Sequence, residues 1–158
     1  MGFAMKKQLD ERELIGEIGE QVVQEFLNST RSSYKYDSEK DGTFLDMIYQ
    51  VKTFRLNNIT QGFWLGDNKE KSMWKNVDNV DMLFFIRIPE KADGLATLYL
   101  CPNHTKAWVK AFRNDGVGVR CYPLTKCVPL GIVSPERSKI LYENSVKIST
   151  HKRYDDVK

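Results

Sequence analysis

The 158-residue sequence has few cysteines, no long hydrophobic run and no large excess of charge of either sign. Its three cysteines are an odd number, which disfavours a secreted disulfide framework and favours free thiols in a reducing compartment. No segment is apolar over the length that crosses a bilayer, and the first residues lack the apolar stretch of a signal peptide. We therefore expect a cytoplasmic protein with no membrane partner.

Several familiar catalytic signatures are also missing. The chain has no Gly-rich phosphate loop, no metalloprotease histidine pair and no Ser, His and Asp in a known triad order. Hydrophobic residues make up 41% and charged residues 28%, which is ordinary for a folded soluble protein. A net charge of +3 favours a polyanionic partner only mildly. With no repeat or linker, we expect one domain over residues 1–158, frayed at 1–9 and 150–158.

Apolar periodicity predicts helices near both ends of the chain. Asp10 and Glu13 form a capping-box pattern, and apolar residues then recur at helical spacing as far as Asn28. Ser134-Pro135 is typical of the first turn of a helix. Helices are expected at residues 10–28, at 72–79, from Asn103 through Phe112, and from Ser134 through Tyr142.

Between these helices the sequence predicts strands at residues 33–36, 44–54, 82–88 and 96–101. Residues 82–88 are apolar enough for a strand that is buried on both faces. Gly42 and Asp46 offer turn positions for a first hairpin, and Asp93-Gly94 for a second. The order of elements predicts an α/β or α+β fold with a mixed central sheet flanked by helices.

The segment most informative about chemistry has the skeleton Asp41-x8-Gln50-x-Lys52. Side chains alternate along a strand, so Gln50 and Lys52 project from one face and Val51 from the other. A hairpin that bends back adds Asp41 to this group. Two oxygen ligands beside an ammonium suit Mg²⁺-assisted phosphodiester hydrolysis, in which Lys52 orients the attacking water.

Two other acidic residues compete for a role. Glu20 lies at the margin of the apolar face of the first helix, so it either reaches toward the site on the sheet or is a solvated helical glutamate. Asp46 is too close to Gln50 for a hairpin to fit between them. We therefore interpret Asp46 as a turn residue.

These motifs resemble the PD-(D/E)XK nuclease superfamily, which includes restriction enzymes and Holliday-junction resolvases. There a glutamate-bearing helix precedes a strand, an aspartate and an (E/Q)-x-K strand, and Glu20, Asp41 and Gln50-Val51-Lys52 keep this order within residues 10–55. The resemblance implies a restriction-endonuclease-like fold, DNA as substrate, Mg²⁺ or Mn²⁺ as cofactor and a homodimer. It also implies that Asp41, Gln50 and the Val51 carbonyl bind the metal, with Lys52 and Glu20 catalytic.

Gln50 departs from the commoner glutamate of that superfamily and weakens the cation site. Either Glu20 supplies the missing charge, or metal binding is loose, or cleavage has been lost. The alternatives to a DNA endonuclease are therefore a catalytically silent nucleic-acid-binding or assembly module, and a nuclease that acts on RNA.

Two further groups of residues have open interpretations. Arg55, Lys69, Lys71 and Lys75 lie near tryptophans in the sequence, and form either a phosphate-contacting patch or solvated cations beside core side chains. Cys101, His104, Cys121 and Cys127 are either an irregularly spaced zinc ligand set or free thiols with an exposed imidazole.

Overall fold

The computed structural model describes residues 10–28, 30–31, 42–56, 61–65, 77–102, 105–112 and 118–156, and the fold is given for these ranges. The strand expected at residues 33–36 and the chain end at 1–9 lie outside them. The elements are α1 (Glu11–Leu27), β1 (Thr30–Arg31), β2 (Gly42–Phe44), β3 (Met47–Phe54), β4 (Gly62–Leu65), β5 (Met82–Arg87), β6 (Thr97–Leu100), β7 (Val109–Phe112), β8 (Gly118–Pro123), the 3-10 helix η3 (Leu124–Lys126), β9 (Val128–Ile132) and α3 (Pro135–Asp156).

Within the described ranges the strands form two sheets. The larger has the order β1-β2-β3-β5-β6-β9, in which β3 and β5 are parallel and all other neighbours are antiparallel. The smaller is the antiparallel sheet β4-β8-β7. A mixed α+β fold is therefore confirmed.

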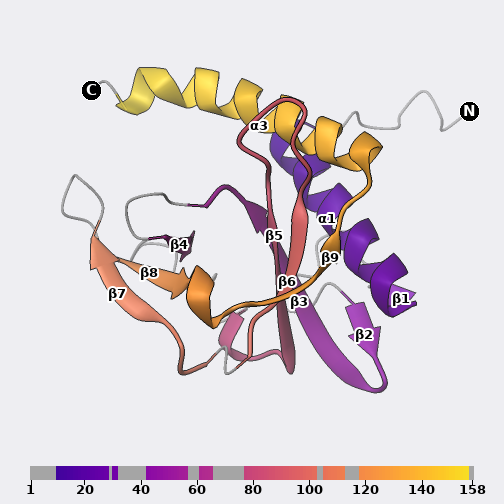
Figure 1. Cartoon of the computed structure of the whole chain (residues 1–158). Coiled ribbons are helices and arrows are strands. Elements are labelled where there is room, and N and C mark those ends of the chain that lie inside the picture. The colour runs from indigo at the N-terminus through magenta and orange to yellow at the C-terminus, as the bar shows by residue number, and fades with distance from the viewer. Residues whose placement is uncertain are drawn as a thin grey trace, which may run out of the picture.

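The larger sheet is the middle of three layers (Figure 1). Helices α1 and α3 cover one face, where Ile18 and Leu141 share a buried cluster with Val51 and Phe84. The smaller sheet covers the other face, where its Phe63 and Tyr122 pack on Leu83 and Phe85. Strand β5 is buried on both faces, as its unbroken apolar sequence predicts.

The first helix has the predicted ends. The Asp10 carboxylate accepts the Glu13 N–H at 2.8 Å, and the Glu13 carboxylate accepts the Asp10 N–H at 3.2 Å. These two bonds satisfy donors that a helix start otherwise leaves unpaired. Asn28 closes the helix in the left-handed conformation, with φ at 51°.

A two-residue turn sets the register of β2 against β3. Leu45 and Asp46 have φ values of 50° and 65°, the two positive values of a type I′ turn, so Asp46 is confirmed as a turn residue. Gly42 is not in the turn but in β2, where it pairs with Tyr49. The prediction for Gly42 is wrong because the turn is tighter than expected.

The prediction of a helix from Asn103 through Phe112 is wrong. Of that span the structure describes residues 105–112, and they contain strand β7, in which Val109 pairs with Cys121 of β8. Trp108 lies edge-on to Phe85 and Tyr122 in the core between the sheets. These apolar residues have helical spacing but form a strand, because long-range pairing and aromatic packing outweigh local helical preference.

The C-terminal helix starts at Pro135 as expected but continues to Asp156, past the predicted end at Tyr142 and through most of the tail expected to fray. Of the short helix expected at residues 72–79, the structure describes residues 77–79, of which Val77 and Asp78 are helical. Strands β4, β8 and β9 were not predicted. Beside β6, strand β9 has mostly exposed side chains, and its Pro129 and Gly131 disfavour a strand in the sequence.

Close contact between α1 and β3 depends on Gly19. A Cβ at this position would lie 2.1 Å from the Thr53 Oγ1 and 3.3 Å from the Thr53 Cβ. We predict that Gly19→Ala lowers the free energy of unfolding by about 1 to 3 kcal/mol, because the helix must move off the sheet. Urea denaturation measures the change.

Gly16→Ala is the matched control, since a Cβ there meets nothing within 4 Å. It should leave stability unchanged or raise it by roughly 0.5 to 1 kcal/mol through helix propensity. Adding Thr53→Ala to Gly19→Ala should restore much of the loss. Equal effects of the two glycine substitutions would contradict the packing explanation.

Candidate functional site

The residues of the Gln50-Val51-Lys52 motif lie in the middle of β3. Val51 is buried in the cluster beneath the helices, whereas Phe54 packs into the cluster beneath the smaller sheet. Because strand side chains alternate, Gln50 and Lys52 face the same side as Phe54. The predicted shared face of these two residues therefore agrees with the packing of their neighbours.

Gln50 is an unusual polar residue for this position. It is only 5% exposed, and its Oε1 is buried without a hydrogen-bond partner in the described structure. In the register of the sheet it stands beside Leu83, and the half-buried Lys52 stands beside Phe85. A buried carbonyl oxygen without a donor is destabilising by about 1 to 3 kcal/mol, so this group calls for an explanation.

Asp41 lies outside the described residues, as do Lys69, Lys71 and Lys75. The structure does describe the residue that follows Asp41 in the chain. Gly42 pairs with Tyr49, the direct neighbour of Gln50.

Glu20 lies in a different layer from Gln50 and Lys52. It is half-buried on α1, whose neighbouring Gly19 contacts Thr53 on the helix-covered face of β3. The side chains of Gln50 and Lys52 project from the opposite face. The structure therefore does not bring Glu20 onto the face that carries Gln50 and Lys52.

Among the described residues, no group of three or more His, Cys, Asp and Glu side chains is placed to hold a metal ion. Two aspartates near the sheet have structural partners. Asp81 accepts the Ile48 N–H at 2.8 Å at the start of β3, and Asp78 pairs with Arg120 at 2.9 Å. A cation site on β3 would thus need Asp41 in addition to the Gln50 carbonyl.

The three cysteines do not converge. Cys101 and Cys127 lie close enough for their thiols to share a hydrogen bond, whereas Cys121 contacts Gly62 in the smaller sheet. His104 lies outside the described residues. Burial, reinforced by Cys127, raises the pKa of the Cys101 thiol, which keeps it protonated at neutral pH. Within the described chain none of the three cysteines forms a disulfide.

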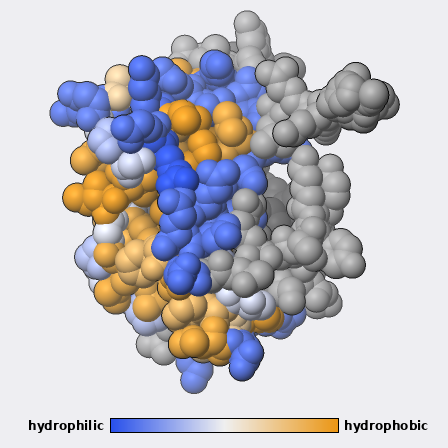
Figure 2. Space-filling view, turned by 90° about the vertical axis from the view of Figure 1, so that its right-hand side faces the viewer, coloured by the Kyte–Doolittle hydropathy of each residue, from blue (hydrophilic) through white to orange (hydrophobic). Residues whose placement is uncertain are grey.

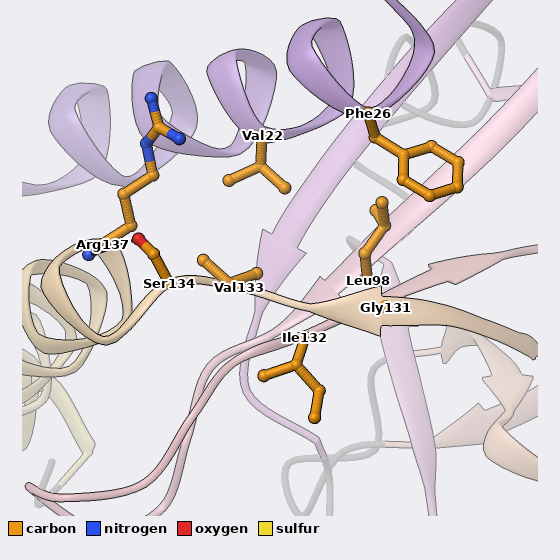
Figure 3. Close-up of a pocket in the computed structure, with 8 residues that line it drawn as sticks. All are labelled: Val22, Phe26, Leu98, Gly131, Ile132, Val133, Ser134 and Arg137. Carbon is orange, nitrogen blue, oxygen red and sulfur yellow. Dashed lines mark hydrogen bonds between the residues drawn. The ribbon is translucent and has the colours of Figure 1, made fainter.

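A small pocket lies between α1 and β9 (Figure 3). Phe26 points from the helix toward Leu98, whereas Ile132 points away on the other side of β9. The volume is about 160 Å³, below the roughly 300 Å³ that is typical of small-molecule sites. Its charged group, Arg137, forms an ion pair with Glu25. This pocket offers no reactive side chain.

A larger pocket, of about 340 Å³, opens between α1, α3 and the end of β3. Arg12, Thr53, Arg55 and Ser145 supply its polar lining. Arg55 donates to the Ser145 Oγ at 3.3 Å, which places this guanidinium on the helix-covered side of the sheet. Sequence reasoning missed this pocket, because its residues are scattered between positions 12 and 148 and leave no local signal.

The surface of the described residues provides no second indication of function. Figure 2 shows hydrophobic patches interspersed with hydrophilic residues on one face. Exposed large hydrophobic side chains include Phe26 and Ile132, which both line the small pocket, and Leu45 in the β2–β3 turn. Among the helices described, none combines the length and apolarity needed to cross a membrane.

No family model and no curated protein matches this sequence. Its function must therefore be inferred from the chemistry of the residues themselves.

We predict that iodoacetamide alkylates Cys127 much faster than Cys101 or Cys121 in the folded protein. Cys127 is half-buried, whereas the other two are about 1% exposed, and only the thiolate reacts. Peptide mass spectrometry after timed quenching measures the three rates. In denaturant all three should react alike, and equal labelling of Cys101 and Cys127 in the native protein would contradict the burial described.

Proposed function

We propose that this protein is a metal-dependent DNA endonuclease with a PD-(D/E)XK-type site on β3 and a restriction-endonuclease-like fold. The order of elements supports this proposal. A helix carrying Glu20 is followed by β1, by Asp41 just before β2, and by the Gln50-Val51-Lys52 strand. The mixed central sheet is compatible with it, although helices cover only one of its faces and the smaller sheet covers the other.

The observation that carries the proposal is the unpartnered Oε1 of Gln50. A buried acceptor with no donor is rare in a folded protein unless something outside the protein binds it. Lys52 shares its face of β3, and the hairpin partner of β3 is preceded in the chain by Asp41. The spacing Asp41-x8-Gln50 in the sequence is what assigns Asp41 to the same site in this proposal.

The donor set suits a hard divalent cation. Mg²⁺ and Mn²⁺ prefer oxygen ligands, which the Asp41 carboxylate, the Gln50 carbonyl and the Val51 main-chain carbonyl would supply. Such a cation would neutralise negative charge on the scissile phosphate. Lys52 would hold the attacking water by hydrogen bonding and favour its deprotonation. Glu20 stays a predicted catalytic residue from the resemblance alone, because α1 covers the opposite face of β3.

A second candidate function is a silent nucleic-acid-binding or assembly module. The burial of Gln50 favours it, because a neutral ligand that is 5% exposed is a weak and poorly accessible cation ligand. An RNA-directed nuclease would use the same residues. A homodimer remains an expectation from the resemblance alone.

The direct test of this proposal is metal-dependent cleavage. Purified protein should cut plasmid or branched DNA with Mg²⁺ or Mn²⁺ and not with chelator, and should spare an RNA of matched sequence. Asp41→Ala and Lys52→Ala should each reduce the rate by at least about a hundredfold, because each removes a group that acts in the transition state. Gel electrophoresis of the products measures the rate.

Asp46→Ala is the matched control for Asp41→Ala, since Asp46 is a turn carboxylate four residues before Gln50. It should leave the cleavage rate within roughly twofold of the parent after a check of folding by circular dichroism. DNA binding without cleavage under every metal, unchanged in Asp41→Ala and Lys52→Ala, would replace the nuclease with the silent module.

A further prediction concerns Gln50 itself. Gln50→Met removes the unpartnered acceptor while keeping the side-chain length, so without metal the free energy of unfolding should rise by about 1 to 3 kcal/mol. The same variant should lose stabilisation by Mn²⁺. Gln50→Glu should bind Mn²⁺ more tightly than the parent, because it restores a charged ligand.

Thermal denaturation with and without Mn²⁺ measures both effects. Gln24→Met, on the outer part of α1, is the control for the amide-to-thioether change, and it should leave Mn²⁺ stabilisation as in the parent. If Gln50→Met lowers stability instead, then the Gln50 Oε1 accepts a hydrogen bond in solution and is not available to bind a metal ion.

A further inference from the structure

The pocket between α1, α3 and the end of β3 is separate from the proposed catalytic face. Thr53 and Arg55 alternate with Lys52 and Phe54, and the hydrogen bond from Arg55 to Ser145 of α3 confirms their opposite direction. Phe54 also lines the pocket at the strand end, but the other lining residues lie on the helix side, so a ligand approaches from the helix layer and not from the face that carries Gln50.

The position of the pocket in the sheet favours ligand binding. Strands β3 and β5 are the parallel pair, and they end here side by side, where the Ile88 N–H donates to the Phe54 carbonyl at 3.2 Å. In sheets with parallel strands, ligands bind in crevices outside the carboxyl ends of those strands. The pocket volume of about 340 Å³ lies within the range of small-molecule sites, roughly 300 to 1,000 Å³.

The polar lining of the pocket is cationic. Arg12 from α1 and Arg55 from the end of β3 supply two guanidinium groups, and no carboxylate lines the pocket among the described residues. The Ser145 hydroxyl accepts from Arg55 and donates to the Tyr142 carbonyl at 3.0 Å, and the Thr53 hydroxyl is buried against Gly19. The two guanidinium groups are therefore the donors that this lining offers to phosphate oxygens.

The remaining lining is apolar and includes Ile15, Ile88 and Ile148. Inorganic phosphate alone would leave this wall in contact with water. A phosphate ester would place its dianionic group between the two arginines and cover the isoleucines with its organic part. A monocarboxylate would leave one of the two positive charges unbalanced.

We propose that this pocket binds a phosphate monoester, with Arg12 and Arg55 holding the phosphate group. The phosphate is either that of a free mononucleotide-like ester or that at the 5′ end of a polynucleotide. Both share the same chemistry, and binding requires neither a divalent cation nor the residues of the catalytic face.

Isothermal titration of the full chain in chelator tests the proposal without any metal. The probes are inorganic phosphate, adenosine 5′-monophosphate, adenosine, and a short DNA strand with either a 5′-phosphate or a 5′-hydroxyl. We expect adenosine 5′-monophosphate to bind more tightly than phosphate, and adenosine not to bind. Tighter binding of the phosphorylated strand than of its hydroxyl form identifies the polynucleotide end as the ligand, and binding of the mononucleotide alone identifies the free ester.

Arg12→Gln and Arg55→Gln should each weaken binding of adenosine 5′-monophosphate by at least roughly tenfold. Arg87→Gln is the matched control, because this half-exposed arginine pairs with Glu90 outside the pocket. Arg12 is exposed on α1, so its variant keeps the fold even if Arg55→Gln does not. Lys52→Ala should bind adenosine 5′-monophosphate as the parent does. The binding result therefore does not depend on whether the protein is a nuclease.

Two results would overturn the proposal. One is the absence of saturable binding of both phosphate and adenosine 5′-monophosphate at millimolar concentration. The other is binding that Arg12→Gln leaves unchanged relative to Arg87→Gln.

Discussion

The parallel pairing of β3 with β5 is the constraint on which the rest of the structure depends. Parallel strands cannot be joined by a tight turn, so the chain must leave the end of β3 and return to the start of β5 over one face of the sheet. Burial of these two strands on both faces then requires two covering layers. The helices supply one, through Ile18 and Leu141, and the smaller sheet supplies the other, through Phe63 and Tyr122.

The sequence predicted those parts of the fold that local chemistry determines. The ends of α1 follow from Asp10, Glu13 and Asn28, whose side chains and backbone satisfy the helix termini directly. Strand β5 follows from a short apolar run that ends before a proline. In each case the determining interactions lie within a few residues of one another.

The parts that the sequence did not predict depend on distant partners. Strand β7 is a strand because Val109 pairs with Cys121 and because Trp108 packs against Phe85 and Tyr122. Helical spacing of its apolar residues was coincidental. Strand β9 contains Pro129 and Gly131, which disfavour a strand, and it is held by backbone pairing to β6 although its side chains are mostly exposed.

The same distinction between local and distant determinants applies to the candidate site. The common direction of Gln50 and Lys52 was predictable, because alternation is a property of any strand. The burial of Gln50 and its missing partner were not, because both depend on the two layers that enclose β3. The placement of Glu20 and Gln50 on opposite sides of the sheet was equally unpredictable, because a helical wheel shows which residues face a sheet but not which face of that sheet they meet.

Strand β3 therefore connects two different chemical environments. Its Gln50 and Lys52 face the aromatic layer, where a low dielectric strengthens any electrostatic interaction and makes an unpartnered carbonyl unfavourable. Its Thr53 and the following Arg55 face the helix layer, at the end of the parallel pair, where Arg12 and Ser145 add polar groups from two helices. Because adjacent residues of one strand line both regions, the alternation of side chains along β3 is enough to separate the two environments by the thickness of a single sheet.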